Sequence, residues 1–342
     1  MPCVDTLTLP HDLCERVTIY TDRDSWLAGR QGFLGASELA AVLGMSHYAD
    51  ASPMRVWQRQ CAPGATPEPD ARRSAWLDMG HRMEPVILTL WEERNPGAVL
   101  YRVPHLVAAH PVYPRLRGTP DALVFRDGVL VSGVDAKNLG VQQAKNLGEE
   151  GSDEVPVDYL MQGLAYCEIF EVPEWHFAVL LGGQRYLTFR VERNAAVAET
   201  IIGRALTWWA LHVEARTPPP ADGSEGTTRL LAALYPRPEL PALPASEEAI
   251  HLGRLSRAAR AAIAAAEEQQ GAADNRLRQI VGPHDGIDGV CTWRANKPSK
   301  KTDWLSAFAE LAARSDPEAA REIAARHTTE KPGARVFRLT IP

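Results

Sequence analysis

The chain has 342 residues, of which 45% are hydrophobic and 23% are charged, and its formal net charge is −6 at pH 7. No apolar run is long enough to span a bilayer, and the N-terminus lacks the layout of a signal peptide, so we expect a cytoplasmic protein. The five cysteines contain no CxxC pair, which argues against a zinc site, an iron–sulfur cluster or a disulfide framework. The mild acidity does not exclude a nucleic-acid binder, because basic groups can line a single channel.

Residues 21–60 are predicted to be helical. Asp22 is placed to cap a first helix, and a second helix should run from Gly35 to Gly44, where a glycine is a typical C-terminal stop. Ser37 lies near the start of that second helix, where a serine usually acts as a cap. A helix N-terminus with a serine hydroxyl and unpaired amides can also bind an anion, so both roles stay open for Ser37.

A long helix followed by several strands is predicted next. Residues 62–71 are rich in Pro, Gly and Ala and are expected to form a loop. Apolar residues then recur at helical spacing between positions 74 and 94, which predicts a helix that carries Glu84. Strands are expected at residues 99–108, 175–181 and 185–191, and further helices at 157–170 and 195–215.

A β-hairpin is predicted around an Asp-Gly turn at residues 127–128. Apolar, β-favouring runs flank this turn, and Asp-Gly between such runs is the strongest short-range hairpin signal. A strict two-residue hairpin would set Val134 opposite Asp121. A bulge at Gly133 would shift the register by one residue and bring Asp135 next to Asp121.

Asp121, Asp135 and Lys137 form the most informative group of polar residues. Asp135 and Lys137 are two positions apart, so a strand directs both side chains to one face. Two converging carboxylates bind a divalent cation, and a lysine beside them can meet a phosphate or a water molecule. This combination suits metal-assisted cleavage of a phosphodiester. The alternative is a surface hairpin whose lysine forms an ordinary salt bridge.

The C-terminal part of the chain is predicted to form a separate helical module. A Pro-rich stretch ends the preceding body, and a long Ala-rich helix is expected from about residue 246 to 280. A strand at 289–294, a basic run through Lys301, two short helices and a final strand at 335–341 should follow. The predicted organisation is a core of residues 1–216, a linker of 217–245 and a C-terminal module of 246–342.

The order of these motifs resembles the YqaJ/lambda-exonuclease branch of the PD-(D/E)xK nuclease superfamily. The resemblance is carried by Pro120-Asp121, Asp135-Ala136-Lys137, the helical segment 80–84 and the segment 159–166 with Gln162. With the C-terminal module included, it covers nearly the whole chain. It implies an α/β, restriction-endonuclease-like core, in which a mixed central sheet is flanked by helices, with a helical C-terminal extension.

The resemblance also implies a metal site. Asp121 and Asp135 would ligate Mg²⁺ or Mn²⁺, hard cations that prefer carboxylate oxygens, and the Ala136 carbonyl would be a third ligand. Glu84 would hold a second ion or its water; the alternative is a glutamate on the surface of its helix. The site would therefore take two ions.

Two further catalytic roles are implied. Lys137 would orient the attacking water and offset charge on the scissile phosphate, and Gln162 would position that water. Glutamate is commoner in this branch at the position of Asp135. The shorter aspartate should shift the local backbone or the metal preference and leave activity intact.

The spacing of Arg30 and Ser37 resembles the pair with which this branch grips a terminal 5′-phosphate. A guanidinium supplies the charge-assisted fork that a phosphate prefers. The function implied is a 5′→3′ exonuclease on linear double-stranded DNA, which leaves a 3′ single strand for recombination. The resemblance also implies a phage or prophage origin, a homo-oligomer that is often a trimer, and a single-strand annealing protein as partner.

Two other functions remain open. One is a metal-dependent endonuclease of the same fold, acting in repair or defence. Arg30 and Ser37 argue against it, because only an end-acting enzyme needs a pocket for a terminal phosphate. The other is a non-catalytic protein that binds DNA ends, which the aspartate at position 135 keeps open.

Overall fold

The computed structural model describes residues 9–62, 71–295, 303–314 and 317–327, and the chain divides into two compact units, Met1–Tyr235 and Pro236–Pro342. The predicted loop at 62–71 lies mostly outside the described residues. The basic run from residue 296 to Lys301 and the predicted strand at 335–341 lie outside them entirely.

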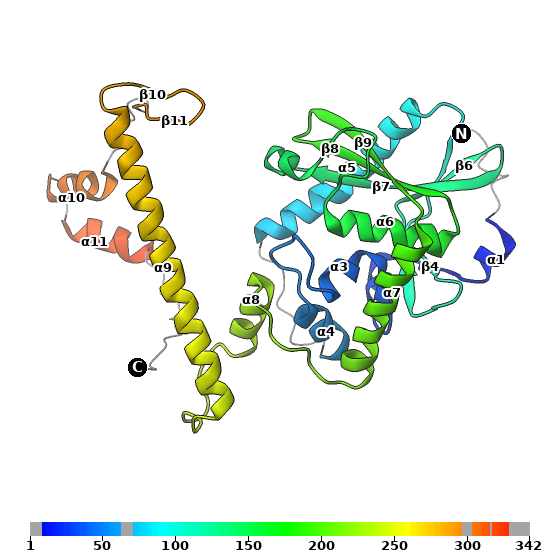
Figure 1. Cartoon of the computed structure of the whole chain (residues 1–342), viewed down its shortest axis with the longest axis horizontal. Helices are drawn as coiled ribbons and strands as arrows, with labels where there is room; N and C mark the ends of the chain where they lie inside the picture. Colours follow the sequence, from blue (N-terminus) through cyan, green and yellow to red (C-terminus); the bar gives the residue numbers. More distant parts are fainter. Residues whose placement is uncertain (1–8, 63–70, 296–302, 315–316, 328–342) are drawn as a thin grey trace. The chain divides into compact units, whose positions relative to one another are not determined.

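A five-stranded mixed sheet forms the centre of the first unit (Figure 1). β7 and β8 are parallel, whereas the other neighbouring strands are antiparallel, so the predicted mixed sheet is confirmed. The order across the sheet is β3 (Val99–Tyr101), β6 (Ala122–Arg126), β7 (Val129–Leu139), β8 (Glu174–Leu181) and β9 (Arg185–Glu192).

The hairpin of β6 and β7 turns at Asp127 and Gly128, whose φ angles of 48° and 77° fit a turn with two left-handed residues. The predicted shift of register is present, but its position is different. Val124 pairs with Ser132 and Phe125 pairs with Leu130, so the extra residue is Val131 and not Gly133.

Gly133 has another structural role. An added Cβ at this position would lie 2.1 Å from the ring of Trp175 on the neighbouring strand β8. The missing side chain therefore makes room for a buried tryptophan, and the residue stays in regular pairing with Leu123.

Two long helices cover the opposite faces of this sheet. Apolar side chains of α5 (Ala71–Arg94), including Trp91, pack with Ala122 and Val134 on one face. α6 (Val157–Phe170) packs with Leu123 and other residues of the second face. The bounds of α6 match the predicted helix, and the helices on both faces confirm the predicted α/β core.

A second, four-stranded sheet was not predicted from the sequence. The expected strand at 99–108 is broken at Pro104 and His105, where His105 has a φ of 62°, so its two halves join different sheets. The order in the small sheet is β1 (Val17–Ile19), β4 (Leu106–Ala109), β5 (Leu116–Gly118) and β2 (Leu34–Gly35).

Short helices form most of the N-terminal segment. Asp22 caps α2 as predicted, because its Oδ1 accepts the Ser25 N–H at 2.8 Å, and Gly44 has the φ of 68° typical of a helix stop. Gly35 is the N-cap of the second helix, which begins at Ala36, so Ser37 is not the cap. The helices are α1 (His11–Cys14), α2 (Arg23–Gly29), η1 (Ala36–Glu38), α3 (Leu39–Val42) and α4 (Pro53–Cys61), with η3 (Val141–Asn146) after β7.

The first unit ends later than the predicted boundary at residue 216. α7 (Ala195–Trp209) and the π-helical turn η4 (Ala210–Glu214) are followed by α8 (Glu225–Leu234), inside the predicted linker 217–245. Ser224 caps α8, Arg229 bonds Asp50 at 2.7 Å and Leu230 is buried. These contacts make α8 part of the core unit, which runs to Tyr235.

The second unit is mainly helical, as predicted. Its predicted strand at 289–294 is reduced to a short pair, β10 with β11. Among the described residues of the chain, no helix is long and apolar enough to cross a membrane. The elements are α9 (Glu247–Val281), β10 (Gly286–Ile287), β11 (Cys291–Thr292), α10 (Trp304–Arg314) and α11 (Pro317–Arg326).

Candidate functional site

The candidate site lies where β6 begins and β7 ends. The bulge sets Ala122 against Val134, and this register places Asp121 next to Asp135. Alternation along the strand directs Asp135 to the face that α6 covers. The Oδ2 atom of Asp121 accepts the backbone N–H of Ala136 at 2.8 Å, which joins the two strands beyond their regular pairing.

Asp135 is buried, with 2% of its surface exposed, and its two oxygens differ. Oδ2 accepts bonds from Lys137 Nζ at 3.0 Å and from Gln162 Nε2 at 2.7 Å. Oδ1 is buried and has no hydrogen-bond donor in the part of the chain that is described. A buried carboxylate oxygen without a donor is costly, so its presence suggests a ligand that is not protein.

Gln162 and Tyr166 on α6 connect the site to the segment that precedes Asp121 through hydrogen bonds. Gln162 also lies 3.4 Å from Lys137 Nζ and donates to the Tyr166 hydroxyl at 3.1 Å. That hydroxyl donates to the Thr119 carbonyl at 2.8 Å, two residues before Asp121. The i,i+4 spacing of Gln162 and Tyr166 was visible in the sequence, but their shared link to Thr119 was not.

The ionisable groups of the site change one another's pKa values. Burial, together with the charge of Asp135, raises the pKa of Asp121 well above its ordinary value. Burial would lower the pKa of Lys137, but the carboxylates of Asp135 and Asp121 outweigh it and raise that pKa. Lys137 therefore stays charged. Its Nζ also lies 5.2 Å and 5.5 Å from the ring centroids of Tyr159 and Phe177.

Glu84 lies on α5, the helix on the other face of the sheet. Its closest ionic neighbour is His81, with Oε2 and Nδ1 4.0 Å apart. Burial raises the pKa of Glu84, and the charge of Asp135 adds to this effect against the opposing influence of His81. The charge of Asp135 thus affects the protonation of Glu84. Within the described ranges, however, no three His, Cys, Asp or Glu residues are grouped closely enough to hold a metal ion.

A divalent cation fits the donors that the structure does bring together. Asp121 and Asp135 are hard oxygen donors on adjacent strands, and one Asp135 oxygen has no partner among the residues that the structure describes. Their mutual repulsion, expressed in the raised pKa of Asp121, is the kind of destabilisation that a bound cation relieves. The arrangement differs from a surface hairpin with an ordinary salt bridge, because Asp135 is buried.

Arg30 and Ser37 belong to a second group of residues, which lies around η1. Arg30 Nη2 is 3.4 Å from Glu38 Oε1, and its guanidinium lies 5.1 Å from the ring centroid of Trp26. Arg59 on α4 binds the same Glu38 oxygen. Ser37 is exposed on η1, directly before Glu38. Sequence reasoning missed Glu38 and Arg59, because nothing local connects residues 21 positions apart.

A third group links the segment after α3 to the start of α6. The buried Asp158 carboxylate accepts bonds from Ser46 Oγ at 2.5 Å and the His47 N–H at 3.0 Å, and it also contacts the His47 ring. The hydroxyls of Tyr48 and Tyr159 lie 2.8 Å apart. These bonds hold α6, and with it Gln162, against the N-terminal segment. They were not predicted.

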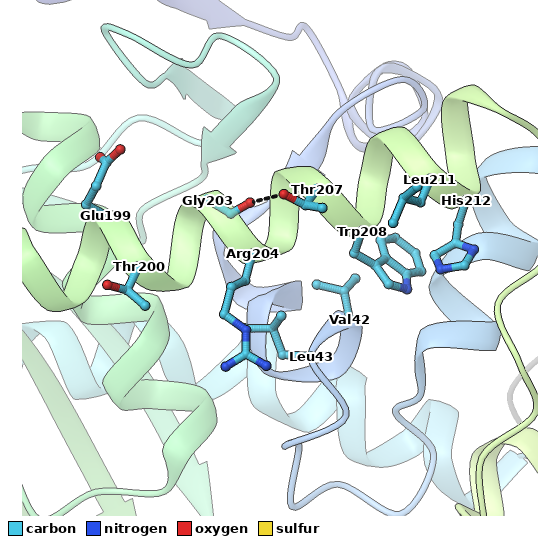
Figure 2. A pocket seen from close by; sticks show the side chains of 10 residues that line it. All are labelled: Val42, Leu43, Glu199, Thr200, Gly203, Arg204, Thr207, Trp208, Leu211 and His212. Atoms are coloured by element: carbon cyan, nitrogen blue, oxygen red, sulfur yellow. Dashed lines mark hydrogen bonds between the residues drawn. The ribbon is translucent and has the colours of Figure 1, made fainter.

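A pocket of about 580 Å³ lies elsewhere, along α7 and the end of α3 (Figure 2). It contains none of the candidate site residues. Its lining is Val42, Leu43, Glu199, Thr200, Gly203, Arg204, Thr207, Trp208, Leu211 and His212.

Two solved structures show similarity to the chain. An alkaline exonuclease (LHK-Exo) from Laribacter hongkongensis is 18% identical, with a TM-score of 0.43, over 62% of this chain and 100% of that one. The same protein in complex with dAMP is 19% identical, with a TM-score of 0.44, over 57% of this chain and 94% of that one.

Sequence comparison finds similarity to a curated relative and to a family model. The uncharacterized protein YqaJ of Bacillus subtilis (strain 168) is 24% identical over 219 residues, which are 64% of this chain and 65% of that protein. The chain thus spans just under two thirds of that relative. A family model described as the YqaJ-like viral recombinase domain matches residues 25–169, an interval that includes every candidate site residue named above from Arg30 to Gln162. Over residues 25–169 the chain is therefore similar to YqaJ-like viral recombinase domains.

Proposed function

We propose that the chain is a divalent-metal-dependent DNA exonuclease that hydrolyses phosphodiester bonds from a duplex end. The observation that carries the proposal is the buried group of Asp121, Asp135, Lys137 and Gln162. One carboxylate oxygen of this group accepts no hydrogen bond from any described residue. The match to a viral recombinase domain supports DNA as the substrate.

Asp121, Asp135 and the carbonyl of Ala136 would hold Mg²⁺ or Mn²⁺, and Glu84 would contribute to a second ion. Bound there, the metal would lower the pKa of water and offset charge on the phosphate. Carboxylate and carbonyl oxygens are the ligands that these ions prefer, which supports this choice over softer metals.

Lys137 and Gln162 would act on the reacting groups directly. The Lys137 ammonium stays charged beside Asp135, so it can stabilise the negative charge that develops on the scissile phosphate. Gln162 is fixed by Asp135 and Tyr166, so its amide can orient the attacking water. Both side chains are held before substrate binds, which reduces the cost of reorganisation.

Arg30 and Ser37 support action from a 5′ end. A guanidinium and an exposed hydroxyl near the start of η1 are suited to a terminal phosphate. On this basis the enzyme would degrade linear duplex DNA 5′→3′ and leave a 3′ single strand for phage-type recombination. A single-strand annealing protein as partner and a homo-oligomer, such as a trimer, belong to the same proposal.

The test uses the purified chain of 342 residues with Mg²⁺ on three substrates. These are end-labelled linear duplexes with a 5′-phosphate or a 5′-hydroxyl, and closed circular duplex. We expect degradation of linear DNA, faster with the 5′-phosphate, no cleavage of closed circles, and no activity in EDTA. Lys137→Ala should abolish cleavage while circular dichroism shows an unchanged fold.

Other outcomes would point to the alternatives. Rapid cutting of closed circles would replace the exonuclease with an endonuclease of the same fold. Tight binding of duplex ends without hydrolysis in Mg²⁺ or Mn²⁺ would indicate a non-catalytic end-binding protein.

A further inference from the structure

Glu38 is a buried carboxylate shared by two arginines. It is 7% exposed, and its Oε1 atom contacts the guanidinium groups of both Arg30 and Arg59. Its Oε2 atom accepts the backbone N–H of Gly35 at 3.1 Å. Two cations therefore converge on one carboxylate oxygen, directly beside the exposed Ser37.

The charges of this group do not balance internally. Two guanidinium groups and one carboxylate leave this group with a net charge of about +1, and the Glu38 carboxylate is buried. The Arg59 Nε atom is buried and has no acceptor among the described residues. One arginine would be enough to neutralise the Glu38 carboxylate, so neutralisation alone does not explain why two arginines contact the same oxygen.

α4 fixes Arg59 and the Arg30 turn relative to each other. Gln60, the next residue on α4, accepts the Gly32 N–H at 2.9 Å and donates to the carbonyls of Arg30 at 3.3 Å and Phe33 at 3.1 Å. The same helical turn that presents Arg59 thus anchors the backbone that carries Arg30. The two guanidinium groups are pre-arranged as a pair.

We infer that Arg59 is the second cation of the terminal-phosphate site and that Glu38 orients both arginines for it. This inference rests on the proposed exonuclease function and deepens its end-recognition step. A terminal phosphate is close to a dianion at pH 7, and two convergent guanidinium groups with an exposed hydroxyl match its charge and its acceptor oxygens. An internal phosphodiester carries only one charge, so the pair favours an end.

The experiment compares the degradation rates of linear duplexes with a 5′-phosphate and with a 5′-hydroxyl. Arg59→Ala in the whole 342-residue chain should lower the ratio of the two rates about tenfold or more, because a hydrogen bond to a charged group contributes roughly 1.5–3 kcal/mol. Arg193→Ala is the matched control. Arg193 is also 40% exposed and paired with a single glutamate, Glu168, away from this group, so its loss should leave the ratio unchanged.

The Arg59→Gln variant separates the effect of losing the charge from the effect of a folding defect. An amide at this position keeps a donor for Glu38 Oε1 but carries no charge, so the fold should persist and the ratio should still fall. The inference is overturned if a folded Arg59→Gln protein keeps the wild-type ratio while Arg30→Ala loses it. If the wild-type protein shows no cleavage or no preference for a 5′-phosphate, the proposed function itself has failed.

Discussion

Asp135 has one oxygen that accepts two hydrogen bonds and one that has no donor among the described residues. Lys137 and Gln162 both use Oδ2, and the short distance to Gln162 shows that the carboxylate is held in place. Oδ1 therefore has a fixed direction, and no donor in the described ranges of the chain competes for it. The fixed direction of this oxygen supports the view that Asp135 lies at the centre of the candidate site.

Asp135→Asn should reduce cleavage by about 10²-fold or more, because the amide removes the charge that holds the cation and balances Lys137. Asp135→Glu should be tolerated, since it keeps the carboxylate at the cost of one added methylene. The comparison is made by initial rates of nucleotide release at saturating Mg²⁺. An active Asp135→Asn enzyme would show that Asp135 is not a ligand.

Asp121 gives a prediction about stability. Its folded pKa is raised by burial and by Asp135, so this carboxyl reduces the stability of the folded protein increasingly as the pH rises from its unfolded pKa towards its folded pKa. Asp121→Asn keeps an oxygen for the Ala136 N–H and removes the repulsion. We expect this variant to lose cleavage and yet to have a higher Tm than the wild type in EDTA.

The sign of the pH dependence follows from the same shift. Below the pKa of an unfolded aspartate both states are protonated, and the stability gain of Asp121→Asn should be absent. The gain should grow as the pH rises through the unfolded value towards the folded one. Adding Mg²⁺ should raise the Tm of the wild type and not that of the variant. A lower Tm for Asp121→Asn in EDTA at neutral pH would contradict this account.

At the scale of elements, the β6–β7 hairpin depends on the absence of a side chain at Gly133. Gly133→Ala would place a methyl group 2.1 Å from Trp175, which is fully buried between the strand and α6. Overpacking of this kind usually costs about 1–3 kcal/mol. We expect a corresponding fall in the free energy of unfolding, measured by urea denaturation.

Gly140→Ala is the control for that substitution. Gly140 follows β7 directly, its φ is −70°, and an added Cβ would have no neighbour within 4 Å. Its stability should change little. Equal effects of the two substitutions would mean that the contact with Trp175 is not what requires glycine at position 133.

At the scale of the whole molecule, the core belongs to the first unit. Nearly all residues of the two buried apolar clusters lie between Leu13 and Val213, on elements of that unit. A protein of residues 1–235 should therefore fold cooperatively and keep the complete catalytic group. Its thermal transition, followed by circular dichroism, should resemble the transition of this unit in the full chain.

A shorter protein of residues 1–216 tests the place of α8. It would lose the bond between Arg229 and Asp50 and the buried Leu230. We expect a lower Tm than for residues 1–235, because α4 would lose its covering helix. If both truncations melt together, α8 contributes nothing to the core and the unit ends near η4.

The sequence by itself determined the features that rest on local patterns. The pattern of residues 157–170 predicted α6 with its bounds, and the Asp-Gly turn predicted the β6–β7 hairpin. The same local spacing placed Asp135 and Lys137 on one face of a strand, and an added residue in the hairpin was expected to bring Asp121 beside them. The centre of the candidate site was therefore predictable, because its residues lie within 17 positions of one another.

Only the tertiary structure decided the features that depend on distant partners. The bulge lies at Val131 because Gly133 must stay regular under Trp175, which is 42 residues away in the chain. The break at His105 and the small sheet depend on pairing between segments that no local pattern connects. The shared Glu38 carboxylate of Arg30 and Arg59 is a contact between separate helices, and contacts of that kind form when hydrophobic packing brings the helices together.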